Sequence, residues 1–237
     1  MITIDFPVRH SYLCANGTLR PSILLEWLQD SATADAERNM DLGREALLRS
    51  HNALWIVSRT SLYIDRPLTP GDYRITTWHA AVRAALWPRG YVVTDADDRV
   101  AARAVTHWTV LSASLPRRIV MLPPVPPQDS PYELPRLVRA RLREPEASAA
   151  HLVTLADLDE NRHVNNARAL DILEDALSPG EAAYSRRLAE AHIHYAGEAH
   201  LGDTLTLDVS HDGAYACVAS SVGASRVHEA MLRYEAL

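Results

Sequence analysis

The stretch DLDENRHVNN, at residues 157–166, gathers side chains that can bind a cation or move a proton. Asp157, Asp159 and Asn161 would be positions 1, 3 and 5 of a calcium loop, where oxygen ligands belong. Such a loop needs glycine at position 6 and a bidentate glutamate at position 12, but the chain has Arg162 and Arg168 there. Two arginines would place positive charge where the cation must lie, so we exclude a calcium site.

Proton chemistry fits the same stretch better. Side chains alternate in an extended loop, so Asp159, Asn161 and His163 would lie on one side while Leu158 and Val164 anchor the other. The helix expected next would aim its free N–H groups and its positive dipole end at the same place. Such a loop could activate water and stabilise charge that develops on a carbonyl oxygen.

Other nucleophiles are not apparent, and a purely structural interpretation stays open. The chain has no G-x-S-x-G motif to present a serine, and neither Cys14 nor Cys217 has a histidine next to it in sequence. Activated water is the remaining route. The alternative is a hydrogen-bonded turn with Asn165 as a helix cap, because Asp and Asn often serve that purpose.

The elements that must position this loop occur in the same order in both halves of the chain. Each half has one amphipathic helix followed by strand-like runs, which predicts an internal duplication with one helix covering each antiparallel sheet. The predicted helices cover residues 20–38 and 165–177, and the predicted strands cover 53–64, 72–82, 90–113, 189–197, 203–211, 214–223 and 225–236. A single irregular α+β domain is the alternative.

A proline-rich segment separates the two halves. Seven of the fourteen prolines lie between Pro123 and Pro145. We therefore predict an N-terminal unit at 1–121, a Pro/Arg-rich linker at 122–150 and a C-terminal unit with the catalytic loop at 151–237. A long surface loop within one domain is the alternative for the middle segment.

The motif N-x-H-V-N-N, the stretch WIVSRTSLYIDRPLTPGD and the linker position together resemble plant and bacterial acyl-acyl-carrier-protein thioesterases. The resemblance spans nearly the whole chain and implies an α+β double hotdog fold, in which two tandem units each pack a long helix on an antiparallel sheet. It also implies hydrolysis of fatty acyl-acyl-carrier protein to free fatty acid and carrier protein, without a cofactor or metal.

The family's active-site residues match four positions of this sequence, Asp159, Asn161, His163 and Glu198. Plant members often carry cysteine directly after the glutamate, whereas this chain has Ala199, so the resemblance leaves no covalent cysteine route. We expect Glu198 to act as general base for water, His163 as acid, base or carbonyl polariser, Asn161 as orienting group, and Asp159 as the group that fixes His163 or Asn161. Which of Glu198 and His163 is the base stays open.

The first half lacks an equivalent site. Its corresponding segment ANGTLRPS has no histidine and no paired asparagines, and Pro67 stands roughly in the place of Glu198. We therefore expect one site per chain, with the first half shaping an acyl tunnel. Trp27, Trp55 and Trp78 are candidate walls, although core packing is the more common role for a single tryptophan.

Composition limits the partners. The 237 residues carry a net charge of −6, and all 24 positive residues are arginine, which argues against general nucleic-acid binding. No apolar run is long enough to cross a bilayer and no signal segment is apparent, so we expect a cytoplasmic protein without a membrane span. An acidic acyl-carrier protein could bind the arginine cluster at 136, 139, 141 and 143, and a solvated linker face is the alternative interpretation. Homodimer formation stays open.

Two groups of alternatives stay open, one for a metal site and one for the function of the protein. His192 and His194 share a strand face and could bind a metal with His200, but satisfied or exposed histidines are the simpler interpretation. An acyl-CoA thioesterase would use the same chemistry on another carrier. A non-catalytic acyl-binding hotdog protein would keep the fold alone.

Overall fold

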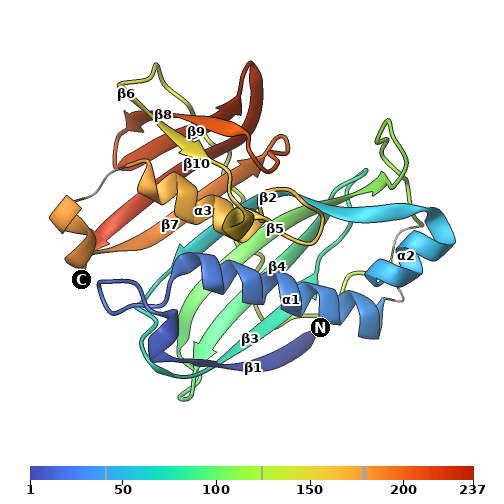
Figure 1. Cartoon of the computed structure of the whole chain (residues 1–237). Helices are drawn as coiled ribbons and strands as arrows, with labels where there is room; N and C mark the ends of the chain where they lie inside the picture. The colour runs from blue at the N-terminus through green and yellow to red at the C-terminus, as the bar shows by residue number, and fades with distance from the viewer. Residues whose placement is uncertain (41, 124, 178–179) are drawn as a thin grey trace. The chain divides into compact units, whose positions relative to one another are not determined.

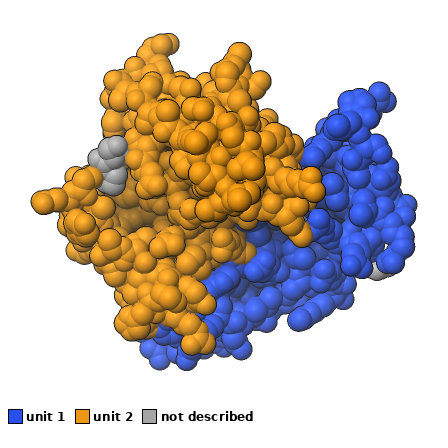
Figure 2. Space-filling view, viewed as in Figure 1, with its two compact units in different colours: residues 1–8, 27–66, 71–137 blue, residues 9–26, 67–70, 138–237 orange. Residues whose placement is uncertain are grey.

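The computed structural model describes residues 1–40, 42–123, 125–177 and 180–237. The chain forms two compact units, which Figures 1 and 2 display as ribbon and as surface. Unit 1 comprises residues 1–8, 27–66 and 71–137, and unit 2 comprises residues 9–26, 67–70 and 138–237.

Unit 1 contains an antiparallel sheet with the order β1-β3-β4-β5-β2. Its strands are β1 (Ile2–Val8), β2 (Ala53–Ile64), β3 (Gly71–His79), β4 (Trp87–Asp95) and β5 (Val100–Ser112). Helix α1 (Pro21–Asn39) packs on this sheet from Trp27 onward, where the Trp27 ring lies 4.0 Å from that of Phe6 on β1. A short helix, α2 (Arg44–His51), precedes β2.

Unit 2 repeats the same strand order as β6-β8-β9-β10-β7. Its strands are β6 (Ala147–Leu152), β7 (Arg186–Tyr195), β8 (Thr204–Asp212), β9 (Tyr215–Val222) and β10 (Ser225–Ala236). Helix α3 (Asn166–Asp175) packs on this sheet (Figure 1). Short 3-10 turns lie at His10–Tyr12, Leu155–Asp157 and Gly180–Tyr184.

The apolar pattern of α3 explains its packing. Ala169, Leu170 and Leu173, the first three residues of the predicted apolar face, are all buried, whereas Leu177 lies beyond the helix end. On β8 the pattern has period two, because Leu205 and Leu207 are buried and their strand neighbours are not. An apolar face of a helix packed on the apolar face of a sheet, whose strands alternate buried and exposed residues, is the arrangement expected for a unit with one hydrophobic core.

The internal duplication extends to individual hydrogen bonds. The predicted halves share strand order, and each has a bridged loop before its helix, Leu13 with Leu19 and Leu158 with Val164. Leu19 N donates to Leu68 O at 2.7 Å, and Val164 N donates to Ala199 O at 2.9 Å. The duplication predicted from the order of elements is therefore confirmed.

Three elements were not predicted: β1, α2 and β6. Strand β6 begins at Ala147, inside the segment interpreted as a linker, while residues 113–123 and 125–146 contain no helix or strand beyond a bridge of Ile119 to Leu111. Pro124, one of the seven prolines, lies outside the described residues. The boundaries at 121 and 150 stay a prediction. In the described part of the chain, no helix is both long and apolar enough to cross a membrane.

Candidate active site

A tight turn brings the residues of the DLDENRHVNN stretch together. Asp159 N donates to His163 O at 3.0 Å, and Arg162 N donates to Asp159 O at 3.0 Å. Arg162 has φ of 68°, a left-handed conformation that is uncommon for a residue with a Cβ. The expectation of an extended, alternating loop was wrong, because backbone hydrogen bonds close the loop into a turn. The side chains converge because of that turn.

Asp159 holds Asn161 and approaches His163. Its Oδ1 accepts from Asn161 N at 2.8 Å, and its Oδ2 accepts from Asn161 Nδ2 at 3.3 Å. Oδ1 also lies 3.8 Å from His163 Nδ1. The carboxylate therefore fixes the amide and places negative charge beside one ring nitrogen of the histidine.

Glu198 reaches the other ring nitrogen from the segment after β7. A bridge between His163 and His200, together with the Val164–Ala199 hydrogen bond, aligns this segment with the turn. Glu198 Oε1 lies 3.9 Å from His163 Nε2. His163 is 18% exposed and Glu198 38%, so a substrate has access to both. Unit 2 thus brings all four predicted residues together.

Asn165 caps α3, as predicted. Its Oδ1 accepts from Ala167 N at 2.8 Å and from Arg168 N at 3.4 Å. The structural interpretation of the loop, a hydrogen-bonded turn followed by a cap, is therefore also correct. The expectation that the helix offers free N–H groups fails at Ala167 and Arg168, because the cap already accepts from both.

Asp157, which begins the stretch, has a structural environment. Its buried Oδ2 accepts from Thr154 N at 2.8 Å and Thr154 Oγ1 at 2.9 Å, and lies 3.0 Å from His151 Nε2. Burial alone would raise the pKa of Asp157, but these hydrogen bonds outweigh it and lower that pKa. Asp157 fixes the 3-10 turn before the site.

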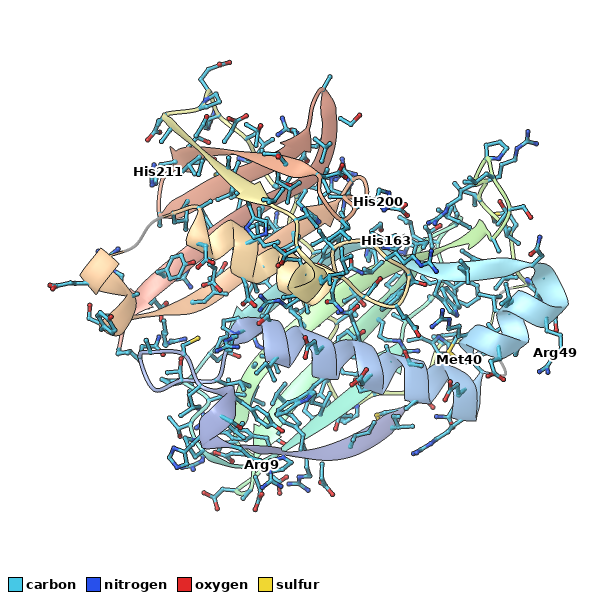
Figure 3. The ribbon with its side chains drawn as sticks, viewed as in Figure 1. Arg9, Met40, Arg49, His163, His200 and His211 are labelled. Atoms are coloured by element: carbon cyan, nitrogen blue, oxygen red, sulfur yellow. The ribbon has the colours of Figure 1, made fainter. Side chains whose placement is uncertain are left out.

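His200 is a neighbour of the site that the sequence did not indicate in this role. Its ring centre lies 5.9 Å from that of His163, and its Nδ1 lies 3.3 Å from Arg162 O (Figure 3). The bridge between His163 and His200 explains their proximity, and no spacing in the sequence signals it.

The metal alternative is not supported by the histidine contacts. His192 Nε2 lies 3.1 Å from Glu190 Oε2, and His194 Nδ1 lies 3.1 Å from Glu229 Oε2. Among the residues that the structure describes, no group of three or more His, Cys, Asp or Glu side chains could hold a metal ion. The three histidines serve separate contacts.

The duplicated loop of the first half carries different side chains. Cys14 N donates to Thr18 O at 2.8 Å, which mirrors the bond from Asp159 to His163. Thr18 thus replaces the histidine, and Pro67, which precedes Leu68, takes the place of Glu198. His163 and Glu198 therefore have no counterpart in this loop, whereas Asn16 stands at the position of Asn161, two residues after Cys14. Burial, the largest cause, raises the pKa of the Cys14 thiol to about 11, so it is not a ready nucleophile.

Unit 1 contains a separate cavity of about 60 Å³. Its lining comes from α1, from Met40 (labelled in Figure 3), and from β2 to β5. The lining residues are Ala32, Thr33, Ala36, Met40, Trp55, His79, Trp87, Pro88, Arg89 and Trp108. Of the three tryptophans predicted as walls, only Trp55 lines this cavity.

Comparison with protein families identifies both halves of the chain. Residues 2–124 match the acyl-ACP thioesterase N-terminal domain, and residues 141–229 match the acyl-ACP thioesterase C-terminal domain. A curated relative from Gossypium hirsutum, a chloroplastic palmitoyl-acyl carrier protein thioesterase, is 25% identical over 202 residues. That alignment covers 74% of this chain and 47% of the relative, so the chain spans about half of the relative's length.

Solved structures share the fold at low sequence identity. An acyl-ACP thioesterase from Bacteroides thetaiotaomicron aligns with a TM-score of 0.84 at 22% identity, over 98% of this chain and 97% of that one. The 12:0-ACP thioesterase from Umbellularia californica aligns with a TM-score of 0.80 at 16% identity, over 100% and 97%. The predicted fold class, an α+β double hotdog, is confirmed.

Proposed function

We propose that this chain hydrolyses a fatty acyl thioester of acyl-carrier protein with activated water. The chain belongs to the acyl-acyl-carrier-protein thioesterase family. The observation that carries this proposal is the position of His163 between two carboxylates. Asp159 Oδ1 lies 3.8 Å from Nδ1, and Glu198 Oε1 lies 3.9 Å from Nε2. One imidazole therefore has a negative partner at each nitrogen.

The spacing between His163 and Glu198 suits a shared water molecule. A separation of 3.9 Å is longer than a direct hydrogen bond, and polar groups at such distances are commonly bridged by water. We assign the attacking water to this position. Either group can then reach its proton, and catalytic contacts of this kind shorten when substrate binds.

Three proton transfers complete the hydrolysis. Glu198 accepts a proton from water as the water oxygen bonds to the carbonyl carbon. The carbon–sulfur bond then breaks, protonated His163 gives its proton to the leaving sulfur, and a proton from Glu198 restores His163. Asn161, whose Nδ2 donates to Asp159 Oδ2, is proposed to orient the water or the carbonyl oxygen.

The proposal also specifies the carrier of the acyl chain and the unit that binds this chain. Acyl-carrier protein is the proposed carrier because both family matches are to thioesterases of that substrate. Acyl-CoA is the competing carrier. We assign acyl binding to unit 1, where Trp55, Trp87 and Trp108 line the cavity.

The decisive experiment measures thiol release from matched acyl-carrier-protein and acyl-CoA substrates of several chain lengths. We expect faster turnover of the carrier-protein substrates, and a loss on the order of 10²–10⁴-fold in His163→Ala and Glu198→Ala. His211 and Glu146 form an exposed pair at 2.8 Å and provide matched control substitutions, His211→Ala and Glu146→Ala.

The outcomes separate the alternatives. Equal or faster turnover of acyl-CoA would replace the proposed carrier. No thiol release by folded wild-type protein, combined with saturable fatty-acid binding, would identify a non-catalytic acyl-binding protein. Unfolding of His163→Ala and Glu198→Ala, seen by circular dichroism, would assign these residues a structural role.

A further inference from the structure

The cavity of unit 1 has a charged wall that the proposed hydrolysis does not use. His79 and Arg89 line it and are only 3% and 5% exposed. Arg89 Nη1 donates to Asp35 Oδ2 at 2.7 Å, and Asp35 is fully buried. Apolar residues of similar volume often stabilise a core as well as a buried ion pair does. A role in binding would explain why this pair lies beside a cavity.

The wall retains hydrogen-bonding capacity toward a ligand. Arg89 Nη2 donates to Met40 Sδ at 3.4 Å, and a thioether is a weak acceptor. Nδ1 of His79 is buried and has no hydrogen-bond partner among the described residues. Since native proteins pair the large majority of buried polar atoms, Nδ1 is a candidate contact for a bound molecule.

The backbone of His79 is held firmly in place. His79 N donates to Gln128 Oε1 at 2.9 Å, and Gln128 N donates to His79 O at 3.1 Å. Gln128 Nε2 in turn donates to Asp35 Oδ1 at 3.1 Å. His79 and the ion pair therefore belong to one network, and a preformed polar group needs little reordering on binding.

Apart from the exposed Thr33, the rest of the cavity is apolar, and the cavity is small. The indole N–H groups of Trp55 and Trp108 are already donated to Leu42 O at 2.8 Å and to Thr106 Oγ1 at 2.7 Å. Their rings therefore offer apolar surface. A volume of about 60 Å³ exceeds the ~15 Å³ that a single water needs, so the cavity has room for a short chemical group.

The charges of the cavity wall and the protonation of His79 favour a ligand with an uncharged oxygen group. Asp35 neutralises Arg89, and the Met1 ammonium, 3.5 Å from Asp35 Oδ1, is 38% exposed and therefore hydrated. Burial, the largest cause, and the charge of Arg89 lower the pKa of His79 and favour its neutral ring, against a backbone hydrogen bond with Ala80 that raises the pKa. A hydroxyl both donates and accepts, so it can bond Nδ1 in either tautomer and can also accept from Arg89.

We propose that this cavity binds a short apolar segment carrying a hydroxyl group, with His79 Nδ1 and Arg89 Nη2 as its polar partners. Two sources supply such a ligand. One is a hydroxylated acyl chain of the substrate, and this source rests on the proposed function. The other is a free hydroxylated lipid, whose binding is independent of hydrolysis.

The first arm of the test measures binding without catalysis. Tryptophan fluorescence of the full chain is titrated with medium-chain fatty acids and with the same acids hydroxylated at successive positions. We expect one hydroxylated isomer to bind roughly fivefold to tenfold more tightly than the plain acid, the ratio that one hydrogen bond supplies. His79→Leu should abolish this preference. His79→Asn, which restores a polar group near Nδ1, should retain it. Thr33→Val should retain it as well, because the exposed Thr33 hydroxyl already donates to Gln29 O at 3.1 Å.

The second arm identifies the source through competition between hydroxylated and plain acyl-carrier-protein thioesters. A hydroxyl preference in kcat/KM that disappears in His79→Leu assigns the ligand to the substrate chain. A preference seen only with free acids assigns it to a separate lipid. Absence of the preference in both arms, or its persistence in folded His79→Leu, overturns the proposal. Failure of wild-type protein to release thiol refutes the proposed hydrolysis and leaves the fluorescence result to decide the cavity.

Discussion

Asp159 has two separable roles at the residue scale. Its oxygens accept from Asn161 N and Nδ2, which holds the turn, and its charge lies beside His163 Nδ1. Substitution Asp159→Asn preserves an oxygen acceptor for the turn but removes the charge. We therefore expect kcat to fall on the order of 10²-fold, while the free energy of unfolding changes by less than about 0.5 kcal/mol.

Steady-state kinetics and urea titration measure these two quantities on the same protein. Asp159→Ala, which removes both roles, should also lose about 1 kcal/mol of stability because the Asn161 N–H loses its acceptor. If Asp159→Asn retains wild-type kcat, the charge beside His163 has no part in turnover and Asp159 serves the turn alone.

Which residues converge could be predicted from the sequence, but the geometry that joins them could not. The spacing of Asp159, Asn161 and His163 indicated acid–base chemistry, and all three converge with Glu198. The turn that joins them depends on Arg162 in a left-handed conformation, and arginine gives no local signal for that. His200 became a neighbour of His163 through pairing of distant segments, which a sequence motif does not encode.

At the scale of elements, long and strongly patterned segments were predictable. Strand β2 occupies the predicted 53–64, and α1 and α3 begin within one residue of their predicted starts. By contrast, β6 is an edge strand of mostly small residues, ASAAHL, and α2 has eight residues with Leu47 as its buried residue. Such short elements form because neighbouring parts of the fold pair with them or pack on them. Their local sequence therefore gives little indication that they form.

Helix α3 also carries a carboxyl group that couples stability to pH. Glu174 accepts from the Tyr234 hydroxyl at 2.9 Å, and burial, aided by Asp171 and Asp175, raises its pKa from 4.5 to about 7. The folded state therefore retains this proton where the unfolded chain has lost it. The stabilisation is complete below pH 4.5 and is lost as the pH rises through about 7, up to about 3 kcal/mol in all.

Glu174→Gln imitates the protonated carboxyl and should remove this dependence. We expect the variant to match the wild type near pH 4 and to exceed it by up to about 3 kcal/mol near pH 8, measured by urea unfolding. His228, whose pKa burial lowers to about 4, changes stability in the opposite sense on the acid side, so the comparison with wild type isolates Glu174. Exposed Glu144→Gln is the control, and equal pH dependence in wild type and Glu174→Gln would contradict the assignment.

At the scale of the whole molecule, the proposed function requires an acidic chain to attract an acyl-carrier protein, which we expect to be acidic as well. The chain has a net charge of −6, but Arg139 and Arg141 are exposed, and Arg143 is paired with Asp212 at 2.9 Å. Local positive charge of this kind accelerates encounter with an acidic partner. These two arginines, together with Arg136, which is also exposed, are therefore the candidates for carrier contact in the segment before β6.

The double substitution Arg139→Glu and Arg141→Glu should lower kcat/KM for acyl-carrier protein on the order of 10-fold at low salt, with the difference shrinking as salt screens the charges. Turnover of a neutral acyl-pantetheine should stay unchanged, because that substrate has no charge to steer. Arg49→Glu, on α2, tests whether any exposed reversal has the same effect. Equal losses for Arg49→Glu and the double variant would mean that net charge, rather than the segment before β6, governs the encounter.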